Sequence, residues 1–487
     1  MSSRLLIFLL LLLSFPAIGY SSKGQLRILI TGDTKGILAS EYASRNQGWL
    51  YLADALSPKP GEVPTLRLDA GDLLGGSDFS HFLTREQSPP RFPQLEILNA
   101  LQWDTVVLGN ADLALGADML RVAQKTANFP MLAGNVEPTR NTWPKFPSFE
   151  IIEKGSFSIG VFGLTTPAAP MWHEKLANDF AFLDILQRAK EITQILREEQ
   201  QVDFIIALLH SGSNKKFGEQ ENLYAGLPNA NAAGWVADHV SGIDLVVSGH
   251  AHQTFPRRPT SHLNRYRTPL VAPGAFGNGW IEVYWALELR KKRWRITQSH
   301  YQYVEAPQEI AEDWLPWLPW QKQADQFMTT ALPIRWLKEP SKTAWSNCTN
   351  KLTKVALPEP RRALLPSWQY EPRLFPNTGE VLKRSHLHRW WPYRNHLQLA
   401  SLHRPQLNIL IDQKKWALIG NRLVEPSNQD VWMLNYHLQG NEGVYRALID
   451  QDQIGQLDSI SWPERLFQFL ETTKTLPADC DFLKIIP

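Results

Sequence analysis

Short apolar runs alternate with glycine-containing turns and helical stretches through the first three hundred residues. The runs are rich in β-branched residues, and each is short enough to be a buried strand. They are Leu26–Thr31, Thr65–Asp69, Thr105–Leu108, Ile159–Leu164, Phe204–Leu209 and Leu245–Ser248. Helical stretches lie between them, of which Phe182–Gln200 is an example. Strands that alternate with helices indicate an α/β architecture.

The pattern changes near residue 300. Trp280–Leu289 and Arg293–Tyr301 predict a hairpin, so some antiparallel sheet should close the first domain. A helix is expected over Glu312–Thr330, and after it proline and tryptophan are dense and helical periodicity is poor. We expect a linker over 305–350 and a smaller, β-rich, tryptophan-rich C-terminal domain over 351–487, whose role the sequence does not give.

The N-terminus has the pattern of an export signal. Arg4 precedes an apolar run from Leu5 to Phe15, and small residues end that run at Pro16–Gly19. The run is shorter than the ~20 apolar residues that a membrane span needs. We therefore expect a signal peptide over 1–19, a periplasmic or secreted protein, and no membrane anchor after cleavage.

Composition is that of an ordinary globular protein of two domains. The 487 residues are 43% hydrophobic and 20% charged, with a net charge of +2, so no strong field would draw the chain to nucleic acid and no such partner is expected. The two cysteines, Cys348 and Cys480, could pair in an oxidising compartment or remain free thiols.

Polar residues follow five of the predicted strands. They are Asp33, Asp72, Asn110, His210 and the pair His250 and His252. Ligands of open α/β sheets bind outside the carboxyl ends of the strands, so these side chains should meet in one crevice. Carboxylate, amide and imidazole together suit a divalent ion of the Mn, Zn, Fe or Mg class. One aspartate after a strand is usually a helix cap, but the ordered series predicts a metal site.

This order of motifs resembles the calcineurin-like metallophosphoesterase superfamily, and within it the secreted 5′-nucleotidases. That family carries D-x-H, G-D, G-N-H-E, a lone His and G-H-x-H in sequence. The matching positions here are Asp33, Gly71-Asp72, Gly109-Asn110, His210 and Gly249-His250-Ala251-His252, and stretches 134–136, 160–167 and 273–277 are also similar. The resemblance covers about residues 25–300.

The resemblance implies a fold and a metal site. The domain over 25–304 should be a four-layer α/β/β/α sandwich that holds one or two divalent ions and acts on a small phosphate ester, nucleotides included. By motif position, Asp72 would bridge two ions. Asn110, His210 and His250 would complete one ion site, and Asp33 and His252 would belong to the other.

Three departures from the family pattern affect the chemistry. Lys35 stands where the family has a histidine ligand, and a protonated ammonium cannot ligate a metal. It would either place its charge where an ion sits or point to solvent. Ala111 and Ala114 replace the catalytic histidine and the carboxylate that orients it. Asp112 is a weak substitute, expected to be structural or a cap, so no catalytic residue is assigned beyond Lys35 and Asp112 as weak candidates.

Three functional hypotheses follow, and whether the chain is an enzyme stays open. The first is an exported metal-dependent phosphoesterase with reduced or altered activity. The second is a catalytically inactive protein that uses the same cleft to bind a ligand. The third is an interaction protein in which the tryptophan-rich C-terminal domain contacts a protein partner. The basic, aromatic segment 383–391 could bind an anion or a metal, but a strand with a solvated basic face is favoured.

Overall fold

The computed structural model describes most of the chain. The described residues are 23–42, 45–85, 91–171, 173, 176, 179–213, 231–261, 263, 266–356, 363–366, 375–383, 385–387, 396–402, 416–419, 429–434, 454–478 and 480–485. The expected signal peptide, residues 1–19, lies outside them. All statements below concern the described residues.

Two six-stranded sheets form the first domain. In spatial order the first sheet is β16 (Arg293–Glu305), β15 (Gly279–Arg290), β1 (Lys23–Thr31), β4 (Thr65–Asp69), β5 (Thr105–Val107) and β6 (Met131–Leu132). The second is β13 (Thr254–Phe255), β14 (Leu270–Pro273), β12 (Leu245–Ser248), β11 (Phe204–His210), β9 (Phe157–Thr165) and β8 (Phe149–Lys154). In the first sheet β1, β4, β5 and β6 are parallel, and the antiparallel strands β15 and β16 lie at one edge. In the second sheet the four central strands are parallel, and an antiparallel strand lies at each edge.

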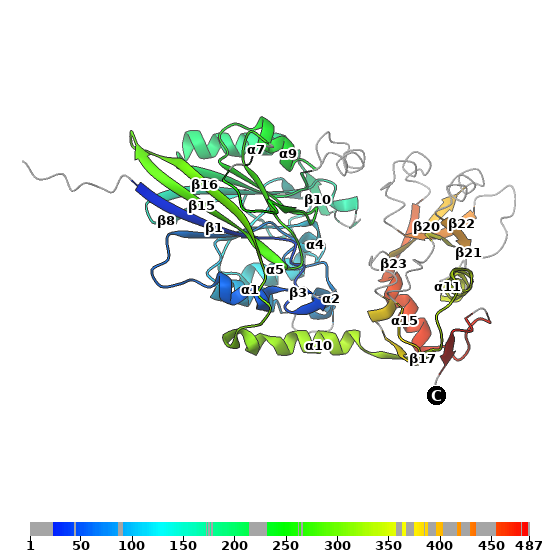
Figure 1. Ribbon diagram of the computed structural model, residues 1–487. Helices are drawn as coiled ribbons and strands as arrows, with labels where there is room; N and C mark the ends of the chain where they lie inside the picture. The colour runs from blue at the N-terminus through cyan, green and yellow to red at the C-terminus, as the bar shows by residue number, and fades with distance from the viewer. Residues whose placement is uncertain are drawn as a thin grey trace, which may run out of the picture.

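Helices cover the outer faces of both sheets (Figure 1). The first sheet packs against α1 (Trp49–Leu56), α3 (Pro93–Ala100) and α5 (Ala117–Thr126), and the second against α7 (Ile185–Gln194) and α9 (Ala233–His239). A separate apolar cluster joins Ile28 and Leu68 of the first sheet to Val161 and Ile206 of the second. The layers therefore run helix, sheet, sheet, helix, as the resemblance implied.

Smaller elements complete this domain. They are β2 (Ser40–Tyr42), β3 (Arg45–Gln47), α2 (Asp78–Arg85), α4 (Asn110–Leu113), β7 (Val136–Pro138), β10 (Phe180–Phe182), a 3-10 turn over Ala169–Met171, and η2 (Ile195–Glu199). The helix predicted over Phe182–Gln200 begins only at Ile185, because Asp184 caps it by accepting a hydrogen bond from the Gln187 N–H at 2.8 Å.

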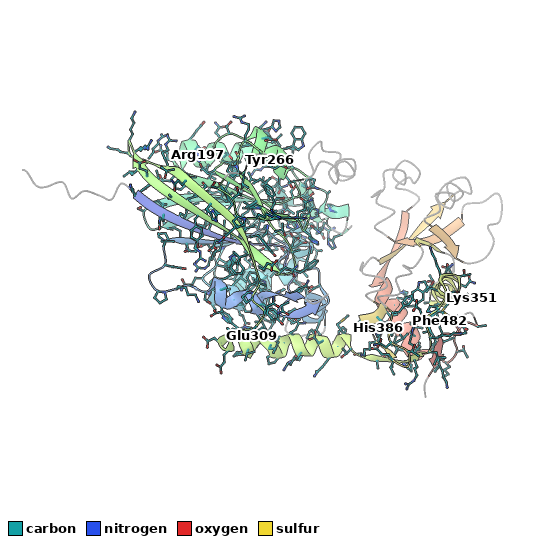
Figure 2. The ribbon with its side chains drawn as sticks, viewed as in Figure 1. Arg197, Tyr266, Glu309, Lys351, His386 and Phe482 are labelled. Atoms are coloured by element: carbon teal, nitrogen blue, oxygen red, sulfur yellow. A yellow bond between two sulfur atoms is a disulfide. The ribbon has the colours of Figure 1, made fainter. Side chains whose placement is uncertain are left out.

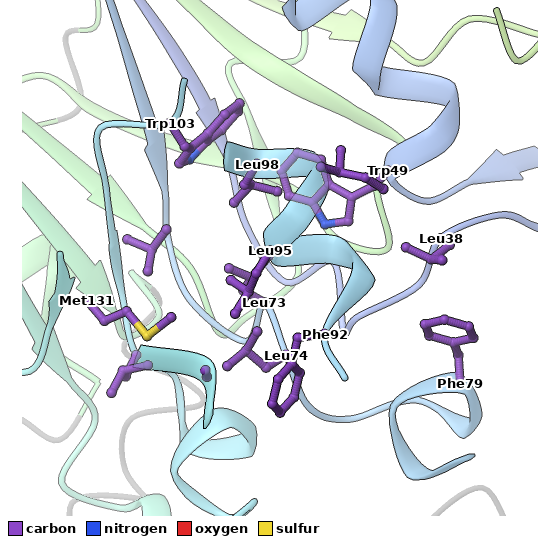
Figure 3. Packing of buried hydrophobic residues seen from close by; sticks show 14 of the residues in the cluster. Leu38, Trp49, Leu73, Leu74, Phe79, Phe92, Leu95, Leu98, Trp103 and Met131 are labelled. Carbon is purple, nitrogen blue, oxygen red and sulfur yellow. The ribbon is translucent and has the colours of Figure 1, made fainter. Parts of the chain in front are cut away.

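Contacts with the apolar core anchor the two loops that carry Asp33 and Asp72. Leu73 and Leu74 follow Asp72 and lie in the cluster shown in Figure 3, where Leu95 and Phe92 of the α3 region also pack. Trp49 lies in the same cluster and donates its indole N–H to the Thr34 hydroxyl at 3.1 Å. Thr34 stands between Asp33 and Lys35, so this loop too is tied to the core.

The stretch 305–350, expected to be a linker, contains the helix expected over Glu312–Thr330 and further regular structure. The 3-10 helix η3 (Glu312–Trp317) and α10 (Leu318–Met328) place Trp314 and Ala324 in the first domain's core. The next elements, β17 (Ala331–Trp336) and α11 (Lys342–Ala356), contribute to a different core. Proline at 316 falls within η3 and does not prevent the turn, and the change between cores comes near residue 330.

In the C-terminal part, the described residues form two sheets and include two helices longer than ten residues. The three-stranded sheet is β19 (Val381–Lys383), β17 and β24 (Leu483–Ile485). The five-stranded sheet is β21 (Trp416–Ile419), β18 (Ala363–Pro366), β22 (Gln429–Leu434), β20 (His396–Leu402) and β23 (Ile454–Ser461), and α15 (Trp462–Thr472) follows it. Cys348 of α11 forms a disulfide with Cys480, which resolves the open question of their pairing.

The described residues include no helix that combines the length and the apolarity needed to cross a bilayer.

Candidate metal centre

Left-handed backbone turns bring the predicted polar residues together. Asp33, Asp72, His250 and His252 have φ angles of 51°, 52°, 69° and 54°, and each lies just beyond a strand. A non-glycine residue in this region costs roughly 1–3 kcal/mol, and such residues cluster at functional sites. At Gly109, which precedes Asn110, an added Cβ would lie 2.1 Å from the Asp72 Oδ1 atom. The backbone therefore approaches the carboxylate as closely as only glycine permits.

One side of the cluster is built around His210, whose side chain is fully buried. Its Nδ1 lies 2.8 Å from the Ala70 carbonyl oxygen, which can only accept, so Nδ1 carries the proton. Its Nε2 lies 3.1 Å from Asn110 Oδ1 and 3.4 Å from Asp72 Oδ1. Asp72 Oδ1 also accepts the Ala111 N–H at 2.8 Å. Three electron-pair donors thus converge, and the His250 ring lies beside His210 with centroids 5.1 Å apart.

The other side contains Lys35. Its ammonium forms an ion pair with Asp72 Oδ2 and lies 3.3 Å from Asp33 Oδ1. Asp33 Oδ1 lies 3.4 Å from His252 Nε2, while Asp33 Oδ2 accepts the His250 N–H at 2.7 Å. Of the two alternatives for Lys35, the structure has the one in which its charge lies between the aspartates.

The electrostatics follow from burial and from this lysine. Burial opposes ionisation of Asp33 and Asp72, but attraction to the Lys35 ammonium together with the neighbouring histidines outweighs it and holds the pKa of both carboxyls below the ordinary value. Burial likewise opposes the charge on Lys35, but the two carboxylates raise its pKa. The ammonium and both carboxylates are therefore ionised at neutral pH.

The His210 side fits a divalent ion. Ligand bonds of about 2.1 Å place neighbouring donor atoms roughly 3.0–3.4 Å apart in octahedral or tetrahedral geometry. The Nε2–Oδ1 distances of 3.1 and 3.4 Å lie in this range. Burial lowers the pKa of His210, but Asp72 outweighs burial and raises it to about 9. This position therefore favours a positive charge, carried either by the imidazole or by a bound metal ion. Asp33, Asp72 and His210 bring one ligand atom each within 4.8 Å of one another.

The remaining predicted residues have distinct positions. Asp112 is fully buried, and its carboxylate accepts backbone N–H groups of Gly109, Leu73, Leu74 and Gly75. It therefore fixes the loop that carries Asp72, as a structural carboxylate would. Ala111 is buried beside Asp72, whereas Ala114 is exposed at the end of α4.

Some residues near the site were not predicted individually. Asp69 accepts hydrogen bonds from Thr31 and Gly71, and burial raises its pKa to about 7. Phe276 packs on the His252 ring with centroids 5.1 Å apart and donates its N–H to the Asp33 carbonyl at 2.8 Å. Phe276 lies in the 273–277 stretch that the resemblance marked, so its place could have been inferred, but no sequence signal indicated the role of Asp69.

A pocket of about 390 Å³ begins one residue after His252. Gln253, Thr254, Phe255, Arg257, Tyr266, Leu270 and Ser213 line it. Its volume is in the range of small-molecule sites. Apolar and polar side chains both contribute, so it offers room for an organic group.

The described residues of the basic cluster over 383–391, which are 383 and 385–387, lie away from this site. His386 is buried in the C-terminal part, on the same side as Phe482 in Figure 2 and away from Tyr266. Its Nδ1 accepts the Lys383 N–H at 2.9 Å. His388 lies outside the described residues.

Comparisons with known proteins match the same part of the chain. The calcineurin-like phosphoesterase family model matches residues 26–254. A trifunctional nucleotide phosphoesterase of Bacillus subtilis is 27% identical over 258 residues, which is 48% of this chain and 17% of that protein. A 2′,3′-cyclic-nucleotide 2′-phosphodiesterase/3′-nucleotidase of Haemophilus influenzae is 26% identical over 253 residues, which is 48% of this chain and 37% of that protein. These matches thus span well under half of each relative.

The solved structures extend the likeness in fold. A Staphylococcus aureus protein described as a 5′-nucleotidase superposes with a TM-score of 0.72 at 15% identity, over 93% of this chain and 98% of that one. At this identity the likeness concerns the fold, and it includes the C-terminal part. The family match and the superposition together confirm the resemblance drawn from the motifs. This chain therefore contains a calcineurin-like phosphoesterase domain with 5′-nucleotidase-like relatives.

Proposed function

We propose that this chain is an exported metal-dependent phosphoesterase that hydrolyses small phosphate esters, nucleotides among them, with reduced or altered activity. The observation that carries the proposal is the convergence of Asp72, Asn110 and His210 at distances suited to a divalent ion. The four residues that would hold it are Asp72, Asn110, His210 and His250. A divalent ion there polarises a phosphoryl oxygen and lowers the pKa of bound water.

The chain's own residues account for the reduced activity. Ala111 offers only a methyl group where the family has the imidazole that assists the leaving group. General acid–base assistance is typically worth about 10²–10⁴-fold in rate. The buried Asp112 cannot substitute, because its oxygens are occupied by four backbone N–H groups. Turnover should therefore rest on binding and charge stabilisation alone.

The substrate class comes from the relatives and from the pocket. The relatives named above act, by their descriptions, on nucleotides and cyclic nucleotides. The pocket whose lining begins at Gln253 has room for the organic part of an ester, and Tyr266 and Phe255 supply aromatic surface there. Arg257 adds a positive charge that suits a second phosphate.

Export rests on two independent features. The apolar run from Leu5 to Phe15 has the length and flanks of a signal peptide. The Cys348–Cys480 disulfide belongs to oxidising compartments such as the periplasm or the exterior.

The test is hydrolysis of AMP, 2′,3′-cyclic AMP and bis(p-nitrophenyl) phosphate by the mature protein, with and without added Mn²⁺. We expect slow, Mn²⁺-dependent hydrolysis that is lost in His210→Ala. Hydrolysis that survives both a chelator and His210→Ala would contradict the proposal, because the activity would then not come from this site.

A second candidate is a catalytically inactive binding protein. The observation that favours it is Lys35, which pairs with both aspartates. The double change Ala111→His and Ala114→Asp separates the two candidates. A weak enzyme should gain about 100-fold or more in rate once the acid–base pair is restored. No gain in a folded double variant would favour the binding protein.

A further inference from the structure

The Lys35 ammonium lies at the centre of the position that a second ion would need. It pairs with Asp72 Oδ2 and is 3.3 Å from Asp33 Oδ1. His252, the third residue that the resemblance gives to this ion, has its Nε2 only 3.4 Å from the same Asp33 oxygen. The two carboxylates that would bind a metal ion here instead flank an ammonium group.

We propose that Lys35 is a built-in replacement for one ion of the pair, and that the site binds a single divalent ion. That ion lies on the side of Asp72, Asn110, His210 and His250. The inference deepens the proposed function, because it sets how many ions the same site takes.

The two carboxylates divide their oxygens in a way that supports one ion. Asp72 presents Oδ1 to His210 and Asn110 and gives Oδ2 to Lys35. Asp33 uses Oδ2 to accept the His250 N–H and presents Oδ1 to Lys35 and His252. The oxygens that a second ion would need are therefore already next to a positive charge.

A charge count leads to the same result. Two carboxylates, one ammonium and one divalent ion sum to +1, which suits a site for an anionic ester. A second divalent ion would raise the sum to +3, with the ammonium in contact with the ligands of that ion. Like charges at this separation disfavour joint occupancy, the more so in a buried site.

The fold also holds Lys35 in place, through both its main chain and the space left for its side chain. Its side chain is 12% exposed. Its main-chain N–H donates to the Asp72 main-chain carbonyl at 2.8 Å. Its backbone is left-handed, with φ 56°. At Gly76 an added Cβ would lie 2.8 Å from Lys35 Cδ, so that glycine leaves room for the lysine stem.

The test is the stoichiometry of Mn²⁺ on the purified mature chain, by calorimetric titration and elemental analysis, with electron paramagnetic resonance to separate isolated from coupled ions. We expect one Mn²⁺ per chain and the spectrum of an isolated ion. Lys35→His restores an imidazole where the family has one, and it should bind two ions with a spin-coupled spectrum. Lys35→Met, which removes the charge without adding a ligand, should bind any second ion at least 10-fold more weakly than Lys35→His.

Two ions, or none, on the wild-type chain would overturn the proposal, and that measurement needs no variant to fold. A folded Lys35→His chain that still binds one ion would also overturn it. Hydrolysis is measured separately, and the two results together keep this proposal apart from the phosphoesterase. One ion without hydrolysis would support the lysine replacement and count against the phosphoesterase, whereas two ions with hydrolysis would do the reverse.

Discussion

Replacing Asp112 by asparagine should destabilise the first domain without acting through catalysis. The Asp112 Oδ1 atom accepts the Leu74 and Gly75 N–H groups at 2.7 and 3.2 Å, and Oδ2 accepts those of Gly109 and Leu73 at 2.9 and 3.3 Å. An amide offers only one acceptor atom. Whichever way it turns, its NH₂ group faces two buried backbone donors.

The size of the effect follows from those two donors. A buried donor left unsatisfied costs about 1–3 kcal/mol, so Asp112→Asn should lower the free energy of unfolding by about 2–6 kcal/mol. Urea unfolding followed by tryptophan fluorescence measures the change, since Trp49 and Trp103 pack in the cluster that also contains Leu73 and Leu74. Mn²⁺ affinity should fall in parallel, because Asp72 loses the support of its loop.

The matched control is Asp118→Asn in α5, where the Asp118 side chain is 85% exposed. Exposed ion pairs contribute at most about 1 kcal/mol, so this variant should unfold close to the wild type. An Asp112→Asn protein that keeps its stability within about 0.5 kcal/mol but loses hydrolysis would refute the structural reading. Asp112 would then be the general acid that takes the place of the missing imidazole.

Three further outcomes are expected. Serine at both Cys348 and Cys480, which are 132 residues apart, should lower the stability of the C-terminal part in urea by up to about 5 kcal/mol from loop entropy, with Mn²⁺ binding unchanged. The pKa of Asp69 is raised from 3.8 to about 7, so the folded state holds the proton and the free energy of unfolding falls as pH rises from about 4 to about 7. Asp69→Asn should remove that pH dependence. At the upper end of this window its free energy of unfolding, measured by urea titration at several pH values, should exceed that of the wild type by up to about 4 kcal/mol. Gly109→Ala should weaken Mn²⁺ binding at least 10-fold in calorimetry, because its Cβ would lie 2.1 Å from an Asp72 oxygen.

The strands, and the order of the polar residues that follow them, could be predicted from the sequence because both depend on local pattern. The six predicted strands correspond to β1, β4, β5, β9, β11 and β12 within a few residues at each end. Buried strands of parallel sheets are near-continuous apolar runs, which few other segments imitate. Asp72 and Asn110 converge because β4 and β5 are parallel neighbours that end at the same edge of the first sheet, and His210 joins them from the end of β11 in the second sheet.

What could not be predicted depends on contacts between distant segments. The local sequence Asp33-Thr34-Lys35-Gly36 does not indicate whether the Lys35 side chain points inward. Its orientation depends on the ion pair with Asp72, 37 residues later, and on the space that Gly76 leaves. The segment 305–350 looked like a linker because its apolar residues have no clear period. Trp314 and Ala324 are buried only because the first domain offers them a surface.

The backbone of the site accounts for how a lysine can take over an ion's position without disturbing the fold. Asp33, Lys35, Asp72, His250 and His252 are all left-handed, and their turns are set by main-chain bonds such as Asp33 N–H to Gly71 O and Lys35 N–H to Asp72 O, both 2.8 Å. These bonds do not depend on which side chain stands at position 35. Any side chain there projects toward the two aspartates, so a histidine would meet them as a ligand and a lysine meets them as a cation. A change at position 35 can therefore alter the number of bound ions without altering the main-chain turns that form the site.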